Sequence, residues 1–408
     1  MLPAVVRRIC ALAAAIATVA ALSTWPPPRA ATRADAAARA ERDFACRNRF
    51  ELVPAASAGT LDALYGVAGA SADDVWAVGS SEGPGRPLRA LIEHWDGTAW
   101  SVTPSPAPPS PSILFSVAAI APDDAWAVGT QVVPGNVTQT LAMHWDGAAW
   151  SIVPTPNTGF VNNFIYSVAA AAPDDVWAVG TTASSSRALA LRWDGVAWSI
   201  VTTPDTGAGT RAILSDVAVV GPDDIWAVGT VIDNNTTART LVEHWDGAAW
   251  SIVPSPSGAG TSSQLYALAA RNGHDILAVG FSGTGATTHT LAERWDGRAW
   301  TIVESDDAAS TGANILRDVA LVTNNDAWAV GYTQSATGVR TAVVERWDGH
   351  RWRLARSPQS GAPGTFLNAA GVAGHRTVWA VGGTESVTGP PFTAAPLAER
   401  RCKGAAPR

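Results

Sequence analysis

The stretch "PDDAWAVGTQVVPGNVTQTLAMHWDGAAW" (122–150) recurs in related form along this chain of 408 residues, with its tryptophans, aspartates and glycines at similar spacing. A Trp-Ala-Val-Gly motif, or Leu-Ala-Val-Gly in one copy, begins at Trp76, Trp126, Trp177, Trp226, Leu277, Trp328 and Trp379. A Trp-Asp-Gly motif begins at Trp95, Trp145, Trp193, Trp245, Trp295 and Trp347. Successive Ala-Val-Gly motifs are 49 to 51 residues apart, which indicates one structural unit repeated seven times.

Each copy has the pattern of four β-strands. In the quoted copy and its flanks the predicted strands are 113–121, 125–130, 140–145 and 148–154. Pro122 and the aspartates that follow it favour a turn, because proline presets φ and aspartate bonds its own backbone. Asp146 and Gly147 form a strong hairpin signal. The unit is therefore predicted to be a four-stranded antiparallel sheet.

The repeat predicts an all-β fold. Outside the N-terminal segment, no stretch keeps the 3.6-residue hydrophobic period of a helix. Four-stranded units of about fifty residues, repeated seven times, are typical of a seven-bladed β-propeller. An open solenoid is the alternative, but an open array needs polar capping repeats, and the chain ends argue against it.

The two ends of the repeat region complement each other. The last copy, "PLAERRC" (396–402), lacks the Trp-Asp-Gly and the fourth strand, whereas "CRNRFELVP" (46–54) has the pattern of a fourth strand with Phe50 in place of tryptophan. We expect the N-terminal strand to join the last C-terminal blade and close the ring. A disulfide between Cys46 and Cys402 would then replace the missing hairpin turn, and two free thiols are the alternative.

The N-terminal segment has the pattern of an export signal. Two arginines precede an apolar run at residues 9–25, three prolines follow it, and small residues offer a cleavage site. The predicted organisation is a signal peptide at 1–35, a linker at 36–43, a propeller domain at 44–402 and a tail at 403–408. An uncleaved membrane anchor is the alternative. After signal removal we expect a secreted or cell-envelope protein, monomeric and without a membrane span.

Composition excludes one class of partner. The net charge is −7, charged residues make up 15% of the chain, and the only lysine is Lys403. Nucleic-acid binding depends on basic residues that neutralise phosphates, so we expect no nucleic-acid partner.

The unit resembles kelch-type repeats and the galactose-oxidase-like propeller superfamily, which also place a glycine at the end of strand two and a tryptophan on strand four. It is most similar to secreted bacterial proteins with repeated "DDxWAVG…HWDGxAW" blades. A double glycine, typical of kelch repeats, occurs only at Gly382 and Gly383. The resemblance implies a fold but no activity, because propellers carry unrelated functions.

The repeated acidic residues are predicted to be structural, since a feature of nearly every blade answers a need that every blade has. No cofactor or metal site is expected. A galactose-oxidase-like copper site needs a cross-linked cysteine, and both mature cysteines are assigned to the disulfide. The seven histidines have no metal-ligand spacing, and no spacing of the arginines indicates a sialidase-type triad.

The candidate site is a column at the start of the first strand of each unit, beside the variable loops. Its members differ from blade to blade, and they are Tyr65, Phe115, Tyr166, Ser215, Tyr266, Arg317 and Asn368. Asp216 and Asp318 occupy the next position in two blades. Aromatic rings with a few polar groups at a channel mouth suit a sugar or peptide ligand; aromatic plugs between blades are the alternative.

Three functions are consistent with these patterns. The first is non-catalytic binding of a cell-surface glycan or an extracellular protein through this column and the variable loops. The second is a glycan-active hydrolase or lyase at the channel mouth, and the third is a purely structural role in the envelope.

The disulfide prediction is tested by counting thiols in the mature protein. We expect Cys46 and Cys402 to resist alkylation after denaturation without reductant and to react after reduction. Two alkylated cysteines before reduction, measured by mass spectrometry, would contradict the predicted bridge.

Overall fold

A computed structural model describes residues 50–401, except residues 84, 107, 109–110, 160, 184, 235, 359–362, 375 and 387–393. The signal, the linker, the tail and both cysteines of the expected disulfide, Cys46 and Cys402, lie outside the described residues. The described residues form an all-β structure of repeated four-stranded antiparallel sheets. No helix long and apolar enough to cross a membrane occurs among them.

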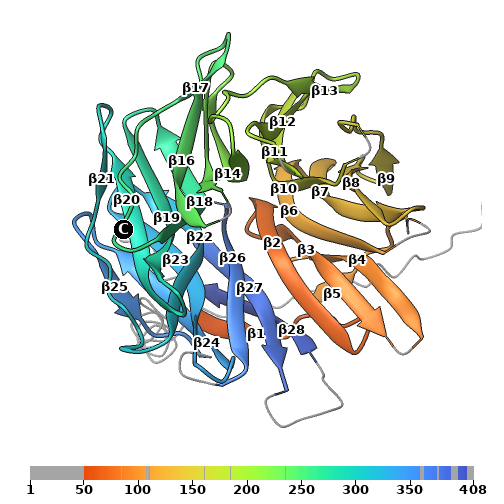
Figure 1. The fold of residues 1–408 in the computed structure, drawn as a ribbon. Coiled ribbons are helices and arrows are strands. Elements are labelled where there is room, and N and C mark those ends of the chain that lie inside the picture. Colours follow the sequence, from red (N-terminus) through yellow and green to blue (C-terminus); the bar gives the residue numbers. More distant parts are fainter. Residues whose placement is uncertain are drawn as a thin grey trace, which may run out of the picture.

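The first strands of the sheets surround a common centre (Figure 1). They are β2 (Leu61–Ser71), β6 (Ser112–Ala121), β10 (Asn163–Ala172), β14 (Thr210–Gly221), β18 (Ser262–Asn272), β22 (Ala313–Thr323) and β26 (Thr365–Ala373). The second strands contain the Ala-Val-Gly motif and are β3 (Asp74–Gly83), β7 (Asp124–Val133), β11 (Asp175–Thr182), β15 (Asp224–Asp233), β19 (Asp275–Thr284), β23 (Asp326–Gln334) and β27 (Thr377–Glu385).

The third and fourth strands complete each sheet. The third strands are β4 (Arg86–Trp95), β8 (Val137–Trp145), β12 (Ala188–Trp193), β16 (Thr237–Trp245), β20 (Thr287–Trp295), β24 (Arg340–Trp347) and β28 (Ala394–Arg401). The fourth strands are β5 (Trp100–Val102), β9 (Trp150–Val153), β13 (Trp198–Val201), β17 (Trp250–Ile252), β21 (Trp300–Ile302), β25 (Trp352–Ala355) and β1 (Phe50–Val53).

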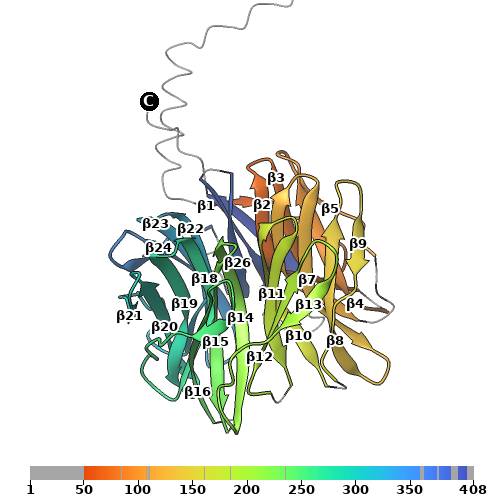
Figure 2. The ribbon, with the colours of Figure 1, turned by 90° about the horizontal axis from the view of Figure 1, so that it is seen from above.

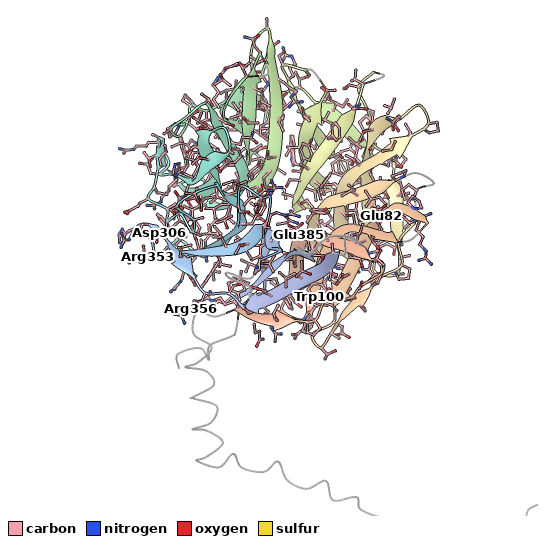
Figure 3. The ribbon with its side chains drawn as sticks, turned by 60° about the horizontal axis from the view of Figure 1, so that its bottom comes forward. Glu82, Trp100, Asp306, Arg353, Arg356 and Glu385 are labelled. Carbon is pink, nitrogen blue, oxygen red and sulfur yellow. The ribbon has the colours of Figure 1, made fainter. Side chains whose placement is uncertain are left out.

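The two ends of the described chain pair with each other. β1 pairs antiparallel with β28, and Phe50 lies opposite Arg401, as Trp150 lies opposite Trp145 within a single copy. Leu61 of β2 pairs in parallel with Ala394 of β28. Figures 1 and 2 show β1 on the side of the molecule where β28 and β2 meet. The fourth strands form the outer edge, where Figure 3 shows Arg353 of β25 at the periphery.

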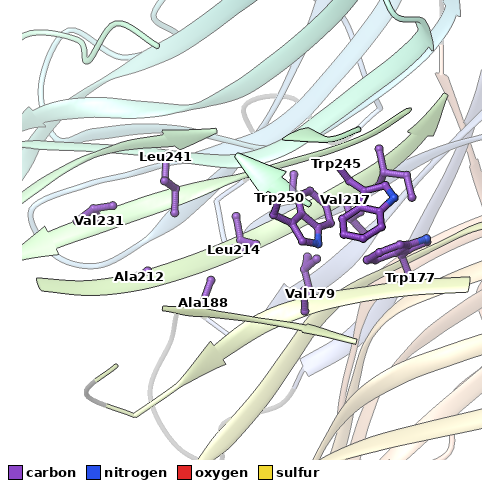
Figure 4. Close-up of a cluster of buried hydrophobic side chains, with 13 residues drawn as sticks. Trp177, Val179, Ala188, Ala212, Leu214, Val217, Val231, Leu241, Trp245 and Trp250 are labelled. Atoms are coloured by element: carbon purple, nitrogen blue, oxygen red, sulfur yellow. The ribbon is translucent and has the colours of Figure 1, made fainter. Parts of the chain in front are cut away.

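Tryptophans fill the interfaces between successive sheets. Trp177 of β11 packs against Trp245 and Trp250 of the next sheet, with ring centroids 5.0 and 5.5 Å apart (Figure 4). Trp379 of β27 packs in the same way on two tryptophans of the first sheet. Phe50 takes the equivalent place on Trp328, edge to face at 5.3 Å. Large aromatic side chains in such pairs contribute both buried area and favourable ring geometry.

The glycine of each Ala-Val-Gly motif lies where a side chain has no room. A Cβ atom on Gly229 would come within 2.0 Å of the carbonyl oxygen of Ile213 on β14. The corresponding distance is 1.9 or 2.0 Å at the other glycines of this column, Gly79, Gly129, Gly180, Gly280, Gly331 and Gly382. The second strand therefore approaches the first closely at one fixed position in every sheet.

This close approach predicts the effect of a single methyl group. Gly229→Ala should lower the free energy of unfolding by about 3 kcal/mol, because overpacking at a tight contact displaces the backbone. Gly221→Ala in the same sheet is the matched control, since nothing lies within 4 Å of its Cβ position. Urea unfolding measures both variants, and equal midpoints would contradict the steric argument.

Candidate functional site

A β-bulge marks one position in every first strand. The pairing of β14 with β15 shifts register between Leu214 and Asp216, and Leu214 lies opposite Gly229. The residues skipped at the corresponding shifts are Tyr65, Phe115, Tyr166, Ser215, Tyr266, Arg317 and Asn368. These are the residues of the column identified in the sequence. A bulge re-aims side chains, so this position is where each sheet directs one side chain toward the centre.

The column residues line a single pocket of about 390 Å³. All eight residues predicted as a binding site contribute to it, and they are Tyr65, Phe115, Tyr166, Asp216, Tyr266, Arg317, Asp318 and Asn368. Ser116, Ser167, Ile213, Ser215, Thr230 and Gln264 are further lining residues. The structure thus brings the whole predicted set together, although the residues come from strands spread over about 300 positions of sequence.

One side of the pocket is an arc of aromatic rings. Tyr65 and Phe115 meet edge to face with ring centroids 5.9 Å apart, and Phe115 meets Tyr166 in the same way at 5.7 Å. Phe164 stacks on Tyr166 at 6.1 Å. Tyr65, Phe115 and Tyr166 come from three different first strands, and Phe164 lies on the same strand as Tyr166. The arc is therefore held by the sheets and not by a loop.

The other side of the pocket is polar and charged. The Arg317 guanidinium lies over the ring of Tyr266, 4.2 Å from its centroid, which is a cation–π contact. The side-chain amide of Asn368 donates a hydrogen bond of 2.9 Å to the carbonyl oxygen of Leu64. Asp216 and Asp318 complete this side. The pocket therefore offers apolar ring faces opposite hydrogen-bonding groups.

The two aspartates also connect neighbouring sheets. Asp216 accepts hydrogen bonds from the Leu268 amide at 2.8 Å and from the Ser167 hydroxyl at 2.5 Å. Asp318 accepts one from the Ala370 amide at 2.8 Å. Ser116, at the equivalent position of an earlier sheet, accepts from the Val168 amide at 3.3 Å. In four sheets the position after the bulge is thus a serine or an aspartate that accepts a hydrogen bond from the next sheet.

Burial raises the pKa of both carboxyls. Desolvation is the main cause for Asp216, and hydrogen bonds from Ser167 and Leu268 oppose it. For Asp318, desolvation is again the largest cause, and the nearby negative charge of Asp216 raises its pKa further. Desolvated carboxyls that repel each other retain protons more readily than exposed ones, so the polar side of the pocket carries less negative charge than its composition suggests.

The repeated acidic residues serve the sheets, as their repetition predicts. Asp146 in the Asp-Gly turn accepts hydrogen bonds from the amides of Ala148 and Ala149, both at 2.9 Å. These amide donors lower its pKa. The second aspartate of the Pro-Asp-Asp turn has another role: Asp124 lies 2.9 Å from Nε2 of His144 on the third strand. The sequence did not indicate this cross-strand pair.

A second set of titratable residues was not anticipated. A glutamate two positions before the Trp-Asp-Gly tryptophan, or its counterpart in the last copy, is fully buried at Glu93, Glu243, Glu293, Glu345 and Glu399. Burial raises the pKa of Glu243 and of Glu293 to about 8. Neither carboxyl has a hydrogen-bond partner among the described residues. In the sequence, these glutamates could have been recognised from the recurring Glu-His-Trp and Glu-Arg-Trp triplets.

No group of three or more histidine, cysteine, aspartate or glutamate side chains is arranged to hold a metal ion within the described part of the chain.

Comparisons with known proteins relate the chain to others through its fold. No protein-family model and no curated protein matches it. Two structures of an ulvan lyase of polysaccharide lyase family PL25, one bound to -[GlcA(1-4)Rha3S]-, are similar with a TM-score of 0.50 and 9% identity, over 83% of this chain and 95% of the lyase. Chaetomium thermophilum Sqt1, bound to the N-terminus of ribosomal protein L10, matches with a TM-score of 0.46 and 11% identity, over 81% of this chain and 86% of that chain.

The likeness to the lyase concerns the fold alone, and it agrees with the repeated sheets: the chain has a β-propeller-like fold. The finer resemblance to kelch and galactose-oxidase propellers stays a prediction.

The buried glutamates predict an unusual dependence of stability on pH. The pKa of Glu243 is raised from 4.5 to about 8 in the folded state. The stability gained from keeping this carboxyl protonated is therefore fully present below about pH 4.5 and is lost as the pH rises through 8. Over that range the free energy of unfolding should fall by up to about 1.4 kcal/mol per pH unit for such a group. Glu243→Gln should remove this contribution and flatten the profile.

Urea unfolding of both proteins between about pH 5 and pH 8 measures the difference. Glu304→Gln is the control, because the Glu304 side chain is 68% exposed and should leave the slope unchanged. A Glu243→Gln profile parallel to that of the wild type would contradict the assignment.

Proposed function

We propose that the repeated sheets are the seven blades of a closed, kelch-like propeller. Two observations support closure: β1 pairs with β28, and Trp379 packs on Trp95 and Trp100 of the first sheet. The proposal includes secretion after removal of residues 1–35 and a Cys46–Cys402 disulfide that joins the strands where a hairpin turn is missing.

The central pocket is proposed to bind a saccharide of the cell surface without catalysis. The observation that carries this proposal is the division of one pocket into an aromatic arc and a polar side. A sugar ring has an apolar C–H face and an edge of hydroxyls. The rings of Tyr65, Phe115 and Tyr166 suit that apolar face. The two tyrosines also offer a hydroxyl group to a hydrated ligand. Asn368, Gln264 and Ser215 suit the hydroxyl edge.

The dimensions of the pocket agree with this ligand class. A volume of about 390 Å³ lies in the lower part of the range of small-molecule sites, which suits one or two sugar residues at the end of a chain or in a branch. The bulges fix the side chains on strands, so little ordering is required when the ligand binds.

A glycan-active enzyme is the second candidate, and the raised pKa values of Asp216 and Asp318 support it. Carboxyls with pKa values raised by burial and mutual repulsion serve as proton donors and acceptors in glycoside chemistry. Their hydrogen bonds to the backbone of neighbouring sheets favour the binding role instead. Release of new reducing ends from a bound polysaccharide would establish catalysis, whereas an intact polysaccharide would leave binding as the function.

The binding proposal is tested on an array of glycans and cell-wall polysaccharides with the oxidised mature protein. We expect a reproducible hit. Tyr65→Ala and Tyr166→Ala should each weaken binding to it about tenfold, since each ring supplies a stacking surface. Unchanged binding by both variants would place the ligand elsewhere on the surface.

Leu354→Ala is the control, because Leu354 is a 47% exposed residue of the outermost strand β25. Circular dichroism and urea unfolding establish that the variants are folded. If no glycan on the array is bound, carbohydrate is no longer the favoured ligand class. An extracellular protein partner or a structural role in the envelope is then favoured.

A further inference from the structure

Arg317 is a charged group that the protein itself leaves without an ion pair. Its guanidinium stacks on Tyr266, but its Nε atom is buried and has no hydrogen-bond partner among the described residues. None of the ion pairs formed by the described residues includes Arg317. Stacking uses the face of a guanidinium and leaves its N–H donors at the edge. Arg317 also acts on the Tyr266 hydroxyl as a hydrogen-bond donor, and its buried Nε remains as a donor without an acceptor in the described structure.

The neighbouring carboxyls form no ion pair with Arg317, although its positive charge partly opposes the rise in the pKa of Asp318. Asp318 and Asp216 lie on the same side of the pocket, yet their oxygens accept hydrogen bonds from Ala370, Leu268 and Ser167. Neither carboxyl is within ion-pair distance of Arg317, in contrast to the arginines of the third strands. Arg192, for example, lies 2.8 Å from Asp175.

A second arginine near the pocket has the same property. Arg211 is four positions before the bulge of β14, and its positive charge acts on Tyr166. Its Nε atom is also buried without a hydrogen-bond partner in the described structure. Two buried guanidinium nitrogens without acceptors lie near one pocket, in a protein whose net charge is −7. Buried polar groups normally have partners, so these two guanidinium groups offer donors to an acceptor in the pocket.

We propose that the ligand is an acidic saccharide, and that Arg317 binds the carboxylate of a uronic acid residue while the aromatic arc packs against the sugar ring. The inference rests on the proposed saccharide-binding function and names its ligand class. A planar guanidinium matches a carboxylate in a bidentate arrangement. Arg211 is the second cation within reach of the ligand, on the side of Tyr166.

The ionisation of the pocket favours such a ligand at mildly acidic pH. The titratable and charged groups that line it are Arg317, Asp216, Asp318, Tyr65, Tyr166 and Tyr266, and the charge of Arg211 acts on Tyr166. The raised pKa values of Asp216 and Asp318 mean that both carboxyls gain protons as the pH falls toward 5. Their repulsion of an anion then declines while the arginines keep their charge, so uronate binding should strengthen from about pH 8 to pH 5.

The test compares uronate polysaccharides, such as polygalacturonate, alginate and glucuronan, with their carboxyl-reduced forms. Reduction converts each uronate to the neutral hexose and leaves stereochemistry and linkage unchanged. We expect the wild-type protein to bind at least one uronate form about tenfold more tightly than its reduced form, the size of effect typical of a charge-assisted hydrogen bond. Arg317→Gln should abolish this difference, so that the variant binds the uronate and the reduced form with equal affinity.

Arg353→Gln is the matched control. Arg353 lies on β25 at the periphery (Figure 3), with its side chain 56% exposed and 3.2 Å from Asp348. This variant should keep the wild-type preference for uronate, and calorimetric titration at about pH 5.5 and pH 8 measures all the affinities. Urea unfolding establishes that Arg317→Gln is folded.

Each other outcome overturns the inference. Equal affinity for uronate and reduced forms, tighter binding of amino sugars, or an unchanged preference in Arg317→Gln would exclude a carboxylate at Arg317 while leaving saccharide binding intact. Binding of a neutral glycan alone on the array would do the same. If no saccharide of any charge binds, the proposed function itself fails.

Discussion

The close approach of two strands at the glycine of each Ala-Val-Gly motif is the constraint on which the rest of the structure depends. At Gly229 the carbonyl oxygen of Ile213 occupies the space that any side chain would need. Ser215, two residues after Ile213 on β14, has no partner on β15. The glycine and the bulge therefore form one feature, which recurs in every sheet. It sets the distance between the first and second strands and leaves one unpaired residue of each first strand at the central pocket.

The tryptophans join each sheet to the next. Each sheet is antiparallel and short, and a single four-stranded sheet has no partner for its faces. Trp177 covers the face of its own sheet and at the same time packs on Trp245 and Trp250 of the next sheet. The last copy has Arg401 where the others have tryptophan, and its guanidinium lies 4.8 Å from the Trp328 ring centroid and 3.0 Å from Asp326. An arginine thus replaces the indole through a cation–π contact and an ion pair.

The sequence predicted the features that repeat, because repetition separates common structural needs from individual ones. The four strands per unit, the role of Phe50 as a substitute tryptophan and the grouping of the variable column all followed from spacing. The sequence did not predict that a bulge creates the column, since a bulge is visible only in strand pairing. Nor did it predict the inter-sheet hydrogen bonds of Asp216 and Asp318, or the pairing of Asp124 with His144. These contacts join residues from 20 to 52 positions apart, and no local pattern encodes them.

The bulge also determines how a substitution can alter this pocket. The column residue of each first strand has no partner opposite it in the ladder, and Tyr65, Ser215, Arg317 and Asn368 all occupy that position in otherwise similar sheets. A substitution there changes one lining residue of the pocket without changing a paired residue of the β-ladder. The pocket is thus assembled from one unpaired position per sheet on a constant frame, so its lining can be altered one residue at a time while the glycine contacts and the tryptophan packing are retained.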